Sequence, residues 1–140
     1  MFLVLCYRSP SGDDNFSDNL RSVLDTISAS RDMPRICVPG DFNFPAINWL
    51  EPNVPTTRKE REFYDVVQDF SLQQHNFSVS HISGNTLDLV LSNFPEAMSD
   101  VSASTCLVES DHLLLDFLIH IKPAKKVKLP QYVYNFKKAD

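Results

Sequence analysis

Apolar positions recur along this chain at two spacings, and each spacing predicts one kind of element. Short apolar runs at 2–7, 35–38 and 87–91 are typical of buried strands. The second run stops at Pro39-Gly40, a pair that favours a turn, so we expect that strand to end there. Residues 101–108 alternate apolar and small polar positions, which predicts a strand with one exposed face.

Two other segments carry apolar residues three and four positions apart, and they predict helices. The first follows Asp13 or Asp14, either of which can cap a helix, and runs for about four turns. Its apolar face is formed by Phe16, Leu20, Val23, Leu24 and Ile27. The second covers residues 58–70, is opened by Thr56 and Thr57, and buries Phe63, Val66, Val67 and Phe70.

The rest of the chain completes a pattern in which strands and helices alternate early and strands dominate late. Residues 44–56 hold three prolines and predict an ordered loop whose Trp49 packs back on the domain. We expect a short strand or turn at 71–77, a turn at 83–85 and an apolar strand at 113–121. This order indicates an α/β fold with a mixed sheet.

Composition and charge limit the class of protein. The chain has 140 residues, 43% of them hydrophobic, which suits one domain or part of a larger one. Residues 1–121 hold 7 basic and 17 acidic residues, whereas residues 122–140 hold six lysines and one aspartate. We therefore divide the chain into a domain at 1–121 and a basic linker at 122–140. An acidic domain binds phosphate poorly unless a divalent metal reverses the local field.

Targeting signals and cysteines point to an intracellular protein, nuclear or cytoplasmic. No apolar run reaches the roughly 18 residues that span a bilayer, so we expect no membrane segment. The apolar start lacks a basic flank, so we expect no secretion signal. The cysteines Cys6, Cys37 and Cys106 lie far apart in apolar stretches, which favours reduced thiols packed in strands.

Gly40-Asp41-Phe42-Asn43 is the sharpest candidate for chemistry. Gly40 would let the backbone turn tightly after the strand. Asp41 and Asn43 are two residues apart, so in extended chain they point to the same side. A carboxylate can accept a proton from water or bind a metal, and a carboxamide can donate to a phosphate oxygen. The alternative is an ordinary turn, for which these residue types are also common.

A second candidate is formed by Ser110-Asp111-His112 together with Asp88. A histidine before a buried strand can supply a proton or a positive charge to a phosphate. Asp88 interrupts an apolar strand, and a buried carboxylate needs a partner, so we expect an Asp88–His112 pair. Tyr7 ends the first strand and could offer its phenol to a phosphate, or could be a core residue. The other histidines, His75, His81 and His120, lack metal-ligand spacing and are interpreted as structural or exposed.

Taken in order, these motifs resemble the endonuclease/exonuclease/phosphatase superfamily. The matching segments are Cys6-Tyr7-Arg8-Ser9-Pro10, Gly40-Asp41-Phe42-Asn43, residues 85–92 and Ser110-Asp111-His112. The segment Gly84-Asn85-Thr86-Leu87-Asp88-Leu89 is most similar in sequence to the endonuclease domain of non-LTR (LINE-type) retrotransposons. The resemblance covers about residues 2–121, and the tail at 134–140 looks like the connector before a reverse transcriptase.

The resemblance implies a DNase I-like, four-layer α/β sandwich and Mg²⁺-dependent hydrolysis of a DNA phosphodiester. By position, Asp41 would orient or deprotonate the attacking water, and Asn43 would hold the scissile phosphate. Asp88 would orient His112, and His112 would stabilise charge in the transition state. Tyr7 would hydrogen-bond the phosphate, and Asp111 would lie near the metal or leaving group. A reverse transcriptase domain would follow in the full polyprotein.

The chain also departs from this superfamily. There the metal is held mainly by an Asn and a Glu from the first half of the domain, and we expect the N-terminal half, with these ligands, to be missing here. Only Asp111 remains as a candidate metal ligand, so we expect weak Mg²⁺ binding and no activity by the chain alone. Alternatives are a lipid or inositol phosphatase of the superfamily, a non-catalytic interaction fragment, and a remnant.

Overall fold

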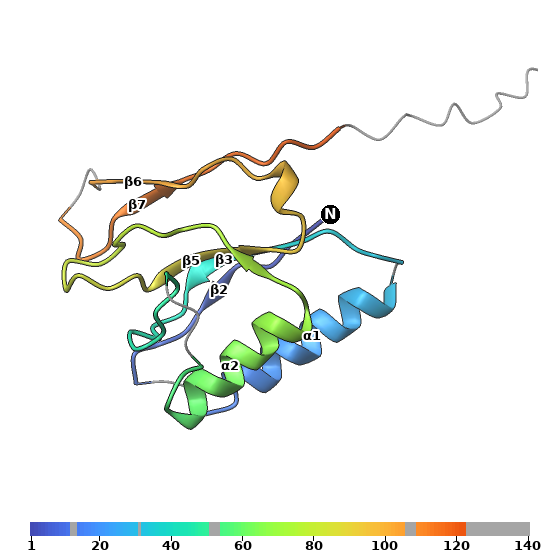
Figure 1. Ribbon diagram of the computed structural model, residues 1–140, viewed down its shortest axis with the longest axis horizontal. Helices are drawn as coiled ribbons and strands as arrows, with labels where there is room; N and C mark the ends of the chain where they lie inside the picture. The colour runs from blue at the N-terminus through green and yellow to red at the C-terminus, as the bar shows by residue number, and fades with distance from the viewer. Residues whose placement is uncertain (12–13, 31, 51–53, 106–108, 123–140) are drawn as a thin grey trace, which may run out of the picture.

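The computed structural model describes residues 1–11, 14–30, 32–50, 54–105 and 109–122. Three layers are stacked in it: two helices, a five-stranded mixed sheet and a two-stranded sheet (Figure 1). Predictions that concern Asp13, Cys106 and the linker after Lys122 lie outside the described residues. The arrangement agrees with the expected α/β class with a mixed sheet.

The five-stranded sheet is built around a central antiparallel pair. This pair is β3 (Ile36–Asp41) and β5 (Asp88–Ser92). The short strands β1 (Phe2–Leu3) and β2 (Cys6–Tyr7) lie parallel to β3, and β4 (Gln73–Gln74) lies antiparallel to β5. The strand predicted at 87–91 and the short strand predicted within 71–77 are therefore confirmed.

Both faces of β3 and β5 are covered, which explains their nearly continuous apolar sequences. On one face, Ile36, Val38, Leu89 and Leu91 pack in a cluster with residues of both helices. On the other face, Cys37 and Val90 pack with Leu115 and Phe117 from the region of the small sheet. Successive side chains of a strand point to opposite faces, so one run of residues serves two cores.

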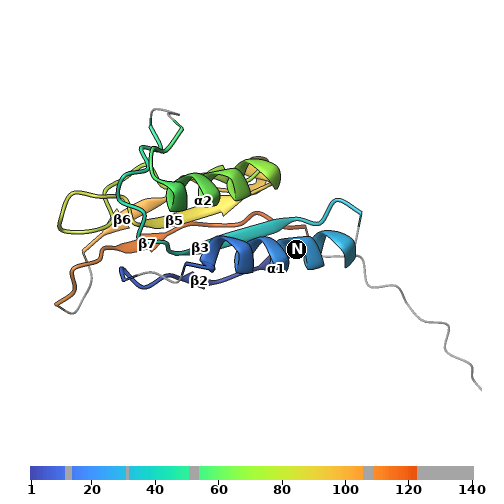
Figure 2. The same cartoon turned by 90° about the horizontal axis from the view of Figure 1, so that it is seen from below.

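The helices α1 (Phe16–Ser30) and α2 (Arg58–Asp69) lie on the same face of the sheet (Figures 1 and 2). Both were expected from the spacing of apolar residues. Thr57 is the N-cap of α2, because its hydroxyl accepts from the Glu60 amide, and the same hydroxyl donates to the Glu60 carboxylate. Arg21 of α1 and Asp69 of α2 form an ion pair of 2.7 Å that links the two helices.

The two-stranded sheet consists of β6 (Ser102–Ser104) and β7 (Leu114–Asp116), and the short 3₁₀ helix η1 (Pro95–Ala97) follows β5. The prediction of one apolar strand over 113–121 is wrong in extent. Pairing with β6 ends at Asp116, after which the described chain makes only the isolated bridge between Met98 and Ile119. Leu118 and Ile121 are exposed rather than packed in a strand.

The prediction of one buried strand over residues 2–7 is also wrong. The segment is divided into β1 and β2, and its side chains alternate between partly buried and exposed. Leu5 is 82% exposed and Tyr7 72% exposed. The reason is that only one face is covered: Val4 and Cys6 pack against the cluster on the helix side, whereas Leu3, Leu5 and Tyr7 point to the opposite face and join neither core cluster.

The expected end of the second strand at Pro39-Gly40 is a third correction, because β3 continues to Asp41. Odd-numbered residues of β3, such as Cys37 and Asp41, turn their carbonyls toward β1 and β2, where Val4 N and Arg8 N donate to them. Pro39 is also odd-numbered, so its missing N–H faces the gap between β1 and β2 and not the β5 ladder. Gly40 is required for a different reason than a turn: a Cβ there would collide with the Cys6 carbonyl.

No helix in the described part of the chain is both long and apolar enough to cross a membrane. The cysteine prediction is confirmed for Cys6 and Cys37, which are free thiols, and burial raises the pKa of each to about 11. Trp49 packs against the rings of Phe63 and Tyr64, as expected for a loop tryptophan that folds back on the domain.

Candidate active site

Three candidate side chains stand in one row across the sheet. Tyr7 of β2 is the register partner of Asp41, the last residue of β3. Asp41 is in turn the register partner of Asp88, the first residue of β5. Directly opposed residues project on the same face of a sheet. All three line a cavity of about 440 Å³ that lies between the sheets, and Leu113–Leu115 close its other side.

Asn43 reaches Asp41 through a turn and not through extended chain. Its φ is +50°, in the left-handed region that asparagine tolerates better than most residues. Asn43 Nδ2 lies 2.8 Å from each carboxylate oxygen of Asp41 and 2.7 Å from the Arg8 carbonyl oxygen. The expectation of extended geometry is wrong, but the two side chains do meet. A phosphate oxygen would have to replace one of these acceptors.

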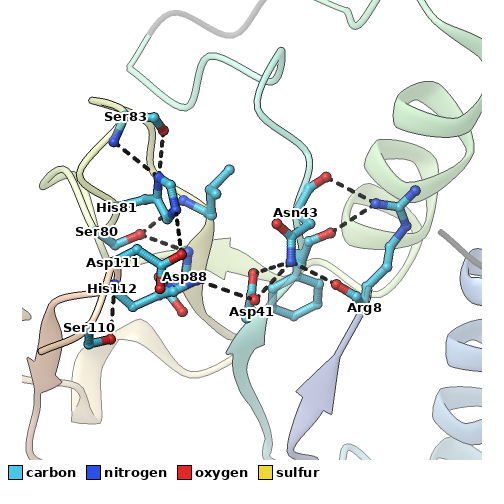
Figure 3. A network of polar contacts seen from close by, with 12 residues as sticks. Arg8, Asp41, Asn43, Ser80, His81, Ser83, Asp88, Ser110, Asp111 and His112 are labelled. Carbon is cyan, nitrogen blue, oxygen red and sulfur yellow. Dashed lines mark hydrogen bonds and ion pairs between the residues drawn. The ribbon is translucent and has the colours of Figure 1, made fainter. Parts of the chain in front are cut away.

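His112 and Asp88 form the expected pair, with Nδ1 of the imidazole 2.8 Å from Oδ2 of the carboxylate (Figure 3). The other ring nitrogen, Nε2, lies 3.9 Å from Asp41 Oδ2. The imidazole therefore stands between two carboxylates and is partly exposed. This geometry fixes the ring so that Nε2 faces the Asp41 carboxylate at the end of β3.

The surroundings shift the pKa values of two of these groups upward. The hydrogen bond to Asp88 holds the pKa of His112 above its usual value, and the nearby carboxylates add to the effect. Burial raises the pKa of Asp41, the charge of Asp88 raises it further, and His112 and Asn43 oppose both effects. Perturbed pKa values on two neighbouring groups are typical of sites that perform acid–base chemistry.

Asp111 is the most exposed member of the group, with 64% of its side chain accessible. A hydrogen bond from its own main-chain amide is the largest cause of its lowered pKa, and His81 and His112 add to the effect. His81 Nε2 lies 3.5 Å from Asp111 Oδ2. The His81 and His112 rings meet edge to face with centroids 4.9 Å apart.

His81 is a site residue that the sequence analysis did not select. Its Nδ1 accepts from the Ser83 amide at 3.1 Å, so Nε2 carries the proton and is directed toward Asp111. Residues 80–82 come beside residues 111–113 because Ile82 N donates to Asp111 O and Leu113 N donates to Ser80 O. The sequence predicted the turn at 83–85, where Gly84 has a φ of +87°, but it did not predict that the chain before this turn would pair with residues 111–113.

Two buried polar residues that were also missed hold Asp88 in place. Ser80 Oγ accepts from the Leu87 and Asp88 amides at 2.9 and 2.8 Å. Asn76 Nδ2 donates to the Asp88 carbonyl at 2.8 Å. Both side chains are fully buried. By contrast, His75 pairs with Ser92 away from the row of carboxylates, in agreement with a structural role.

The site residues supply some, but not all, of the ligands that a divalent metal ion needs. In the described residues, ligand atoms of Asp41, Asp88 and His112 lie within 4.8 Å of one another, and so do those of His81, Asp111 and His112. Mg²⁺ requires near-octahedral oxygen ligation. Asp88 is already engaged by His112 and Asp41 by Asn43, and Asp111, the most exposed of the three, is engaged by His81 and by its own main-chain amide. These residues therefore do not fit a complete Mg²⁺ shell.

Comparison with solved structures defines the fold class. The chain is similar to the endonuclease domain of TRAS1, a telomere-specific non-LTR retrotransposon, with a TM-score of 0.63 and 14% sequence identity. The match covers 85% of this chain and 58% of that one, so the chain spans a little over half of the TRAS1 domain. The fold is thus that of the DNase I-like endonucleases, of which three of the four sandwich layers are described.

Sequence comparison then identifies the family. The model of the endonuclease-reverse transcriptase family matches residues 1–115. The chain belongs to this family, and the resemblance to retrotransposon endonucleases of the endonuclease/exonuclease/phosphatase superfamily is confirmed. A search of curated protein sequences finds no significant match.

Proposed function

We propose that this chain carries the acid–base part of a phosphodiester-hydrolysing site that acts on DNA, as part of a retrotransposon polyprotein with a reverse transcriptase. The observation that supports this most is the alignment of Asp88, His112 and Asp41, with separations of 2.8 and 3.9 Å. Family membership supports the assignment to DNA cleavage rather than to a lipid or inositol phosphatase.

In this proposal each side chain has one task. Asp41 orients the attacking water and takes up its proton, and its raised pKa makes it a better proton acceptor. His112 stabilises the negative charge that develops on the phosphoryl oxygens, and its raised pKa favours the protonated form that does so. Asp88 holds the imidazole in the orientation this requires.

Three further residues complete the proposed site. Asn43 and Tyr7 would hydrogen-bond the scissile phosphate, Asn43 from the turn after β3 and Tyr7 from the exposed end of β2. Asp111 would lie near the leaving group or the metal, since it is the exposed carboxylate beside His112. Mg²⁺ is the expected cation. We propose that it binds weakly, because the described carboxylates supply only part of an octahedral shell.

Nicking of supercoiled plasmid tests the proposal. The purified chain is compared in Mg²⁺ and in EDTA with Asp41→Ala and with Asp25→Ala, which removes an exposed carboxylate from α1. We expect no more than trace conversion to open circles by the chain alone, because the described carboxylates supply only part of a Mg²⁺ shell. Any conversion should need Mg²⁺, be lost in Asp41→Ala and persist in Asp25→Ala, and nicking that survives EDTA or Asp41→Ala would refute the proposed site.

A second function has its own supporting observation. The edge strands β1 and β2 carry Leu3, Leu5 and Tyr7, which are all largely exposed on the face that turns toward the small sheet. Exposed edge strands with apolar side chains pair readily with other chains. A non-catalytic interaction role would therefore use this edge. Light scattering of the wild-type chain measures its association, and the plasmid assay measures its nicking. Association without nicking would support the interaction role, and nicking by a monomer would support the catalytic role.

A further inference from the structure

Arg8 follows β2 directly and is buried, with 7% of the residue exposed. Its guanidinium Nη1 donates to the Asn43 carbonyl oxygen at 3.0 Å and to the Phe42 carbonyl oxygen at 3.5 Å (Figure 3). The guanidinium carbon lies 4.2 Å from the centroid of the Phe44 ring. A buried cation is costly unless such groups satisfy it, so the residue type is unusual for a core position.

The main chain of Arg8 is bound to the same turn. Its amide donates to the Asp41 carbonyl at 2.8 Å, and its carbonyl accepts from Asn43 Nδ2 at 2.7 Å. Arg8 and Asn43 therefore hold each other reciprocally: the arginine side chain binds the asparagine backbone, and the asparagine side chain binds the arginine backbone. All of these contacts meet at residues 41–43.

The turn needs such support because Asn43 has a φ of +50°. A non-glycine residue in this region is strained and persists where its surroundings determine the conformation. A planar guanidinium can reach two carbonyls and stack on a ring at once, which an ammonium cannot. The arginine thus matches this position in shape as well as in charge.

We propose that Arg8 is a positioning residue, which holds the turn at 41–43 so that the Asn43 carboxamide stays against the Asp41 carboxylate. Its effect on DNA nicking rests on the proposed function, whereas its effect on Asp41 does not. Loss of Arg8 would release Asn43 from the left-handed conformation and separate Nδ2 from Asp41.

The state of Asp41 reports on this directly. Asn43 is among the groups that lower the pKa of Asp41, against burial and the charge of Asp88, which raise it. The charged or titratable groups around Asp41 are Asp88 on β5, His112 before β7 and Tyr7 on β2. None of these contacts Arg8 by hydrogen bond, so removal of Arg8 should act on Asp41 through Asn43.

The test is a carboxyl-carbon NMR titration of the whole chain. Arg8→Met is compared with Asn43→Ala, with the double variant, and with Arg35→Met as a matched control. Arg35 also lies over a phenylalanine ring, Phe94, but at the other end of β3. We expect the pKa of Asp41 to rise in Arg8→Met and in Asn43→Ala by the same amount, with no further rise in the double variant and none in Arg35→Met.

An unchanged Asp41 pKa in folded Arg8→Met, or additive shifts in the double variant, would overturn the proposal. If Arg8→Met fails to unfold cooperatively, Arg8→Lys retains the charge and the stem, and we expect a smaller rise of the same sign. In the wild type, slow rotation and resolved Nη signals of Arg8 are expected, and averaged signals would also overturn it. Where the wild type nicks plasmid, Arg8→Met should slow nicking about tenfold or more, with the larger effect on kcat.

Discussion

His112 Nδ1 lies 2.8 Å from Asp88 Oδ2, although 24 residues separate the two in the chain. They meet because residues 80–82 run beside residues 111–113 and carry His112 over the start of β5. Ser80 Oγ accepts from the Asp88 amide and Asn76 Nδ2 donates to the Asp88 carbonyl, so both fix the backbone of Asp88. The electrostatic state of the site therefore depends on a contact between two short segments outside the regular strands.

Asp88→Asn should lower the pKa of His112. The hydrogen bond to Asp88 is the largest cause of the raised value, and an amide cannot supply the negative charge. Since the folded-state pKa is raised, protonated His112 stabilises the fold at low pH, and this stabilisation is lost as pH rises through that value. In Asp88→Asn this stabilisation should be lost at lower pH than in the wild type. Any nicking activity that needs protonated His112 should likewise decline at lower pH.

Proton NMR titration of His112 measures this shift. Asp116→Asn is the control, because Asp116 is an exposed carboxylate on β7. A His112 titration curve that is identical in Asp88→Asn and wild type would contradict the pairing.

His81→Ala should raise the pKa of Asp111, because it removes a hydrogen bond that lowers it. His81→Gln retains an N–H donor and should restore part of the effect. Carboxyl NMR measures both variants, and His120→Ala, at an exposed histidine, serves as the control. If the Asp111 titration is the same in His81→Ala and His120→Ala, His81 has no part in the site.

Gly40→Ala should destabilise the fold by about 1–3 kcal/mol, because its Cβ would collide with the Cys6 carbonyl and push β2 away from β3. Urea denaturation followed by tryptophan fluorescence gives the free energy of unfolding. Gly84→Asn is the comparison, since Gly84 has open space around it and asparagine tolerates its positive φ. Equal losses in the two variants would mean that β2 does not approach β3 as closely as described.

Leu5→Lys should reduce self-association without loss of thermal stability. The Leu5 side chain is 82% exposed on the edge formed by β1 and β2, and a lysine there opposes pairing between edges. Multi-angle light scattering measures the effect, with Val23→Lys as the control, because Val23, which was expected on the apolar face of α1, is 45% exposed. Loss of association in Val23→Lys alone would assign the contact to the helices instead.

Short-range patterns in the sequence determined the helices, the central strands and the residue types of the site. Apolar spacing and the threonines at 56 and 57 are local signals, so α2 could be predicted to within one residue. The need of a buried carboxylate for a partner also followed from residue types, and it led to the Asp88–His112 pair. The four motifs taken in order, together with the sequence around Asp88, indicated the family, although each motif alone is also common in ordinary turns and strands.

Tertiary structure alone decided which residues share the site and which surfaces stay exposed. His81, Ser80 and Asn76 join it through pairing between distant segments, for which no periodicity exists in the sequence. The extent of β3 through Pro39 depends on which neighbour its missing N–H faces. Exposure of Leu3, Leu5 and Tyr7 depends on whether another part of the chain covers the second face of β1 and β2. Each of these is a property of partners that lie far away in the chain, and local sequence does not encode them.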